Sequence, residues 1–140
     1  MNLEEREAYA VKLHMDGYNC AQAIIGSYSD VIGLSFDDAM KLTYGLGAGM
    51  GKMREACGTV IGAGLVLSYY YGQAKPDADK KAEVYGIVNR FDKEFKENHE
   101  GKITCRDLLN LESDESDYLN KPFCNILIKD VVKQLDDYLK

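Results

Sequence analysis

The stretch GLGAGMGKMREACGTVIGAGLVLSYYYG, residues 45–72, decides the expected fold of this chain. Glycine stands at every second position from Gly45 to Gly51, and two basic residues, Lys52 and Arg54, follow. Cys57 then opens an apolar run. Because glycine permits backbone conformations that other residues avoid, we predict a flexible loop that delivers the Cys57 thiol to the first turn of a buried helix.

That central helix is expected from about residue 55 to residue 71. Gly58, Gly62 and Gly64 lie inside it, and each costs about 1 kcal/mol relative to alanine in a helix interior. A compensating interaction is therefore required. Missing side chains let two helix backbones approach closely, so we expect this helix to pack tightly against a neighbour. The tyrosines at 69–71 point in three directions, so at least one ring should be exposed.

Helical spacing of apolar residues, with capping residues in front of each run, predicts the other helices. They are expected over 2–16 (capped by Asn2), 20–32 (capped by Asn19), Phe36 to about Leu46, 78–98, a short helix from Cys105 after Thr104, and a last helix from Pro122. The third should bury Phe36 and Tyr44, and the acidic stretch LESDESDYLN (111–120) should be exposed. No segment alternates like a strand. The predicted fold is all-α, a single-domain bundle of six to seven helices spanning 1–140, with a glycine-rich central helix.

Composition limits the function classes. The chain has 140 residues and a net charge of −6, without the clustered basic face that nucleic-acid binding requires. Its apolar run from Thr59 to Tyr71 is shorter than the roughly 20 residues of a membrane span. The acidic, amphipathic N-terminus differs from a signal peptide. We therefore expect a cytoplasmic protein whose cysteines stay reducible.

The four cysteines each stand where a helix is expected to begin: Cys20, Cys57, Cys105 and Cys124. The positive end of a helix dipole favours a thiolate over a thiol. Basic neighbours would add to this effect, namely Lys52 and Arg54 before Cys57, Arg106 beside Cys105 and Lys121 before Cys124. Gly58, the residue after Cys57, is a further candidate supporting residue of the site. His14, near the end of the first helix, is expected on the surface, and His99 at a helix C-terminus.

Other interpretations of the cysteines stay open. Cysteine often serves as a small buried hydrophobe. Zinc or an iron–sulfur cluster could use all four sulfurs as ligands, although the close C-x-x-C pairs of such sites are absent. No cofactor is required if the cysteines form disulfides, and four cysteines allow three pairings.

The glycine loop also has more than one interpretation. Gly47, Gly49 and Gly51 could line a cofactor or anion site through their backbone amides. However, the loop matches neither G-x-G-x-x-G nor a P-loop, and no strand precedes it. A segment that lets a substrate or a partner thiol reach Cys57 is the favoured alternative.

The contexts of the four cysteines resemble one known family. They are YNCAQA around Cys20, GLGAGMGKMREACG leading into CGTVIG at Cys57, ITCRDLL at Cys105 and PFCNILI at Cys124. In this order they resemble the redox-active C_GCAxxG_C_C family of bacteria and archaea over about residues 15–135. Thr59 replaces the alanine of the family signature, one small residue for another. The resemblance implies redox activity and identifies these as the family's four cysteines.

The sequence therefore predicts a thiol-redox protein that cycles cysteine pairs between dithiol and disulfide, which would make it a thiol–disulfide oxidoreductase. We expect Cys57 to attack, activated by Lys52 or Arg54, Cys20 to resolve, and Cys105 and Cys124 to form a second pair. The electron donor would be a redox partner or a small thiol. The alternatives are a metal or iron–sulfur protein, and a helical interaction module that dimerises through its tyrosine-rich end.

Overall fold

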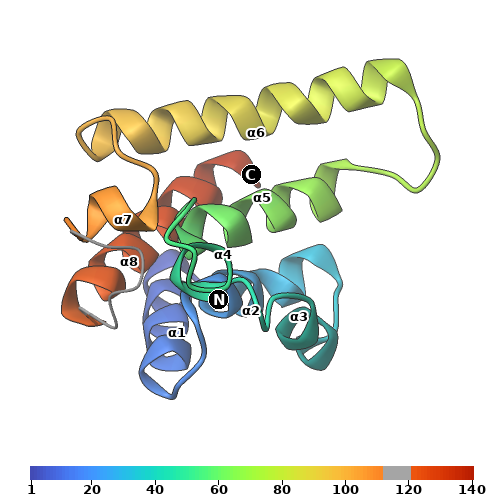
Figure 1. Ribbon diagram of the computed structural model, residues 1–140. Helices are drawn as coiled ribbons and strands as arrows, with labels where there is room; N and C mark the ends of the chain where they lie inside the picture. Colours follow the sequence, from blue (N-terminus) through green and yellow to red (C-terminus); the bar gives the residue numbers. More distant parts are fainter. Residues whose placement is uncertain (112–120) are drawn as a thin grey trace.

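The computed structural model describes residues 1–111 and 121–140 (Figure 1). Within these ranges the chain forms seven right-handed helices, and the only β-pairing is one isolated bridge. The helices are α1 (Leu3–Met15), α2 (Cys20–Ile32), α3 (Phe36–Leu42), α5 (Gly58–Tyr71), α6 (Ala78–Asn98), α7 (Cys105–Leu108) and α8 (Lys121–Tyr138). The label α4 (Gly47–Met50) marks a turn with non-helical dihedral angles. The predicted all-α fold is confirmed.

The apolar helix α5 lies at the centre of the arrangement. It packs against α2 on one side and against α6 on the other, while α8 contacts α1, α2 and α5 (Figure 1). Fully buried aliphatic and aromatic side chains from these helices form the core: Ile24, Ile25, Val66, Leu67, Phe91, Phe95, Ile128, Val131, Val132 and Leu135. Their burial supplies the main favourable free energy of folding.

Local capping fixes the helix starts, as the sequence predicts. Asn2 and Asn19 each form a reciprocal capping box, with Glu5 and Gln22 respectively. The side chains that cap α3, α6 and α7 also accept hydrogen bonds from backbone amides: Ser35, Asp77 and Thr104. These bonds satisfy amides that a helix terminus otherwise leaves without a partner. Cys20 and Cys105 directly follow two of these caps, whereas Cys57 is itself the N-cap of α5 and makes no side-chain capping bond. Cys124 lies in the first turn of α8.

The third helix is shorter than predicted. It ends at Leu42 instead of about Leu46, because Thr43 caps it and the chain then turns into the glycine segment. Phe36 is only partly buried. Tyr44, predicted to be buried, has 78% of its surface exposed, so that prediction is wrong. The apolar spacing in the sequence continues to Tyr44, but the helix itself ends before that residue.

Close approach of α2 and α5 explains two of the three glycines in the central helix. A Cβ atom at Gly62 would lie 2.9 Å from the Ala21 carbonyl oxygen, and one at Gly58 would lie 3.0 Å from Cys20 Sγ. A Cβ atom at Gly64 would meet nothing within 4 Å. Close packing against a neighbouring helix therefore does not explain the glycine at position 64.

Several side chains that the sequence predicts to be on the surface are exposed in the structure. Tyr69 and Tyr70 are exposed, and the basic residues of α6 at 90, 93 and 96 are exposed as well. His99 caps the C-terminus of α6. The acidic stretch 112–120 lies outside the described residues. No helix in the described part of the chain has the length and apolarity that crossing a bilayer requires.

Candidate redox site

The glycine segment forms a left-handed turn. Five successive residues, Ala48 to Lys52, have φ between 51° and 73°. Backbone hydrogen bonds close the turn, from the Arg54 amide to the Ala48 carbonyl (3.2 Å) and from the Glu55 amide to the Gly49 carbonyl (2.9 Å). This conformation costs about 1–2 kcal/mol for each residue other than glycine. The predicted flexible loop is therefore a hydrogen-bonded turn.

The turn requires a glycine at position 49. It is buried, with φ +73°, and a Cβ atom there would lie 2.6 Å from Arg54 Cα and 2.7 Å from Cys105 Cβ. Only glycine fits this space. Gly47 packs on Asn19 instead, and Gly51 is exposed.

A short antiparallel pairing joins the end of the glycine segment to the chain before α7. The bridge pairs Ala56 with Thr104. The Cys57 amide donates to the Ile103 carbonyl (2.9 Å), and the Cys105 amide donates to the Glu55 carbonyl (2.6 Å). This pairing places two cysteines that are distant in sequence on neighbouring segments.

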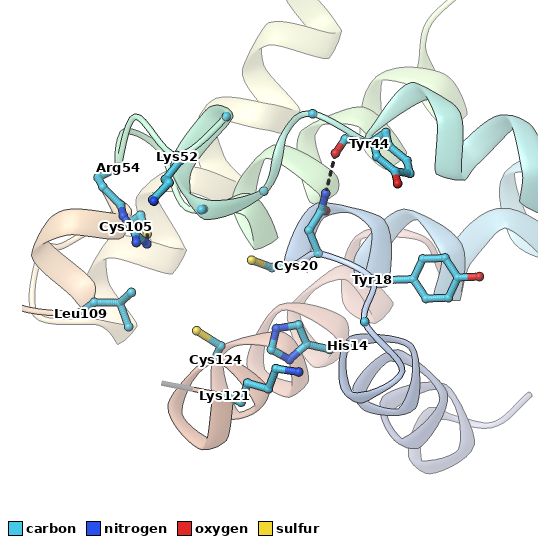
Figure 2. Close-up of a pocket in the computed structure, with 16 residues that line it drawn as sticks. His14, Tyr18, Cys20, Tyr44, Lys52, Arg54, Cys105, Leu109, Lys121 and Cys124 are labelled. Atoms are coloured by element: carbon cyan, nitrogen blue, oxygen red, sulfur yellow. Dashed lines mark hydrogen bonds between the residues drawn. The ribbon is translucent and has the colours of Figure 1, made fainter. Parts of the chain in front are cut away.

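Three of the four cysteines line one cavity of about 490 Å³ (Figure 2). Cys20 comes from α2, Cys105 from α7 and Cys124 from α8. The glycine segment forms another wall, with small residues at 45, 47, 48 and 51. None of the four cysteines forms a disulfide, and their sulfurs do not meet at one point. The fold thus gathers thiols from three helices around a shared space.

Cys57 is absent from the cavity wall. Only 5% of its surface is exposed, and its sulfur lies 3.0 Å from Thr59 Oγ1. Burial raises the pKa of the Cys57 thiol to about 12. The expectation of an attacking Cys57 thiolate does not agree with this environment, because desolvation outweighs the effect of a helix start.

Cys20 is half-buried at the first position of α2. Burial raises the pKa of its thiol, while hydrogen bonds from the backbone amides of Ala48, Cys20 and Ala21 oppose that rise. The stabilisation expected at a helix start is therefore present but smaller than the cost of desolvation. The bond from Ala48 also ties the left-handed turn to Cys20.

The basic residues contact different partners from those predicted. Arg54, expected to activate Cys57, is 1% exposed, and its Nη1 lies 3.4 Å from Cys105 Sγ. Arg106, expected to support Cys105, donates instead to Glu55 Oε1 at 3.3 Å. Lys52, also expected to activate Cys57, lines the cavity, whereas Cys57 does not. Sequence adjacency misassigns these contacts because the bridge between residues 56 and 104 determines which side chains meet.

His14 is a site residue that the sequence interpretation placed on the surface. It is 8% exposed and lines the cavity (Figure 2). Its Nδ1 lies 2.7 Å from Asn125 Oδ1. Burial lowers the pKa of its imidazole. The spacing of Arg6, Ala10, Leu13 and His14, all buried, could have indicated the inner face of α1.

The described donors do not form a metal site. Among residues 1–111 and 121–140, no three or more His, Cys, Asp or Glu side chains are grouped as ligands for an ion. A zinc or iron–sulfur site requires its ligands to converge on one point. The described residues give no such convergence of ligands.

Comparison with protein families agrees with the resemblance of the cysteine motifs. A family model described as "Putative redox-active protein (C_GCAxxG_C_C)" matches residues 18–138, which include all four cysteines. The chain belongs to this family. No curated protein and no solved structure shows a significant match. For the C_GCAxxG_C_C chain described here, the structure adds that Cys20, Cys105 and Cys124 share a cavity and Cys57 does not.

Proposed function

We propose that this protein exchanges electrons through a pair of cavity cysteines that cycles between dithiol and disulfide. The observation that supports the proposal is the convergence of Cys20, Cys105 and Cys124 on one cavity from three separate helices. Isolated structural cysteines would have no reason to share a solvent-connected space. A guanidinium beside one of the sulfurs adds a feature typical of reactive thiols.

Within this set we propose Cys20 and Cys105 as the redox pair. Both line the cavity, Cys20 from α2 and Cys105 from α7. The left-handed turn contacts Cys20 through the Ala48 amide, and Arg54, two residues after the turn, contacts Cys105 through its guanidinium. Because the two sulfurs are not bonded in the structure, oxidation requires them to move together.

The exchange itself follows ordinary thiol–disulfide chemistry. The Cys105 thiolate attacks one sulfur of a substrate disulfide, and the other substrate sulfur leaves as a thiolate. The Cys20 thiolate then attacks the Cys105 sulfur and releases the second substrate thiolate. The protein loses two electrons to the substrate, and the two protons of its thiols end on the two product thiols.

Peptide mapping after equilibration with glutathione redox buffers tests the proposal. We expect one intramolecular disulfide, between Cys20 and Cys105, that persists in the Cys57→Ser and Cys124→Ser variants. Cys20→Ser and Cys105→Ser should abolish it. A protein that keeps four thiols under strongly oxidising conditions, or whose disulfide contains Cys57, contradicts the proposal.

A further inference from the structure

We infer that His14 accepts the thiol proton of Cys20 and delivers it to the leaving sulfur when the redox pair closes. This inference rests on the proposed function and assigns a residue to its second step. Its basis is the position of His14 in the cavity wall, together with the hydrogen bond that fixes which ring nitrogen can take a proton.

His14 and Cys20 lie on either side of the turn that joins α1 to α2. The Gly17 amide donates to the His14 carbonyl (3.2 Å). The next amide, that of Tyr18, donates to the Leu13 carbonyl (3.1 Å). The chain therefore turns directly after α1, and both side chains line the cavity. Figure 2 shows the imidazole ring and the Cys20 sulfur directed into the same space.

Asn125 determines which nitrogen of the ring carries the proton. Nδ1 of His14 lies 2.7 Å from Asn125 Oδ1. The amide nitrogen of Asn125 lies 3.3 Å from the sulfur of Met15, an acceptor that fixes the orientation of the amide. Because Oδ1 can only accept, Nδ1 donates, and the neutral ring has its lone pair at Nε2. Nε2 makes no hydrogen bond to any residue within 1–111 and 121–140, so its lone pair is left for a group in the cavity.

The environment of the ring keeps it neutral at neutral pH. Burial lowers the pKa of the imidazole, the hydrogen bond with Asn125 opposes that effect, and the charge of Lys121 on α8 lowers the pKa further. On its own helix, Lys12 and Asp16 pair with each other at 2.6 Å. Apart from two tyrosines, the other titratable or charged groups of the cavity wall are Cys20, Lys52, Arg54, Cys105 and Cys124.

Cys20 needs a proton acceptor. Burial raises the pKa of its thiol, and the hydrogen bonds that oppose this rise come from backbone amides, which cannot remove a proton. The nucleophile in disulfide exchange is the thiolate. A general base acts from hydrogen-bond distance or through one water, and a polar cavity of about 490 Å³ has room for such a water.

The step balances in protons and electrons. Nε2 of His14 takes the proton of Cys20 as the Cys20 sulfur bonds to the Cys105 sulfur. The bond between Cys105 and the substrate sulfur breaks, and the imidazolium returns the proton to that leaving sulfur. His14 ends the step neutral, and the two electrons of the new disulfide have passed to the substrate.

Two neutral disulfides with different leaving groups test the inference. Bis(2-hydroxyethyl) disulfide releases a strongly basic thiolate that needs a proton, and 4,4′-dithiodipyridine releases a weakly basic one that does not. The measurement, by acid quenching and mass spectrometry, is the decay of the mixed disulfide on Cys105 in protein that carries Cys57→Ser and Cys124→Ser. His14→Gln should slow the decay of the hydroxyethyl adduct about a hundredfold and that of the pyridyl adduct much less.

The pH dependence of the hydroxyethyl decay locates the proton. With His14 present, the rate should be nearly flat around neutral pH and fall below the pKa of the imidazole, because the imidazolium cannot accept a proton. In His14→Gln it should rise about tenfold per pH unit, since only the free thiolate reacts. His99→Gln, the matched control, should keep the flat region. Asn125→Asp should move the fall to higher pH, because a carboxylate beside Nδ1 favours the imidazolium.

The outcomes separate this inference from the proposed function. Equal slowing of both adducts by His14→Gln, or one pH profile with and without His14, would overturn the inference alone. The Asn125→Asp profile does not depend on the folding of His14→Gln, and an unmoved fall would also overturn the inference. If neither disulfide oxidised Cys20 and Cys105, the proposed function would fail and the inference with it.

Discussion

Arg54 and Cys105 are 51 residues apart in sequence, and the guanidinium Nη1 of Arg54 lies 3.4 Å from the Cys105 sulfur in the interior of the protein. Arg54 reaches this place because it follows the left-handed turn and has φ +58° itself. The backbone around Arg54 also pairs with the segment that carries Cys105, since the Arg106 amide donates to the Arg54 carbonyl. The conformation of the glycine segment is thereby coupled to the environment of a cavity thiol.

Removing the guanidinium should make Cys105 less reactive. A charge-assisted hydrogen bond to a thiolate contributes about 1.5–3 kcal/mol, so Arg54→Met should slow alkylation of Cys105 by iodoacetamide by about tenfold or more. Arg106→Gln, which removes the contact with Glu55, is the matched control and should have little effect. The measurement is residue-resolved mass spectrometry of alkylation, with helical content checked by circular dichroism. An unchanged rate at Cys105 would show that Arg54 has only a structural role.

Cys57 should make folding sensitive to alkaline pH. Its pKa is raised from 9.0 to about 12, so the unfolded chain releases this proton at lower pH than the native protein. The associated stability is fully present below about pH 9 and is lost as pH rises toward 12. Over that range the loss is up to about 4 kcal/mol.

Urea unfolding of the wild type and Cys57→Ala as a function of pH measures this effect. Other groups titrate in the same range, so the difference between the two proteins is the relevant quantity. As the pH rises from 9 toward 12, the free energy of unfolding should fall more for the wild type than for Cys57→Ala. Parallel pH profiles would contradict the buried, neutral Cys57 thiol.

The left-handed turn should respond in opposite directions to two substitutions. Met50 is 50% exposed with φ +70°, so Met50→Gly should raise the free energy of unfolding by about 1 kcal/mol. Gly49→Ala should lower it by more than about 2 kcal/mol, since the new methyl would overlap the backbone of Arg54. Both are measured by urea unfolding. Stabilisation by Gly49→Ala would mean that the turn is not closed as described.

The glycines of α5 provide a second matched pair. Gly64→Ala should stabilise the protein by about 1 kcal/mol, because alanine is the better helix former and no atom lies within 4 Å of the added methyl. Gly62→Ala should destabilise it, since the methyl would lie 2.9 Å from the Ala21 carbonyl oxygen and would push α2 away from α5. Thermal unfolding monitored by circular dichroism compares the two. Equal effects would contradict the close approach of these helices.

The sequence predicted those parts of the fold that depend on neighbouring residues. The starts of α1, α2 and α7 were predictable because Asn2, Asn19 and Thr104 cap amides only three residues away. The positions of Cys20 and Cys105 at helix starts follow from the caps at Asn19 and Thr104. The length of α3 was overestimated, since apolar spacing continues to Tyr44 although the helix ends at Leu42.

Which groups act on each thiol was decided by tertiary structure. The sequence placed Arg54 next to Cys57, but the bridge between residues 56 and 104 brings it to Cys105 and leaves Cys57 in the core. The sequence also placed His14 on the surface. In the structure, α1 packs against α8 and His14 is buried. Capping and helical periodicity act over a few residues and can be read from the chain. Burial and charge contacts act between segments that meet only after folding, and these determine the environment of every thiol in the site.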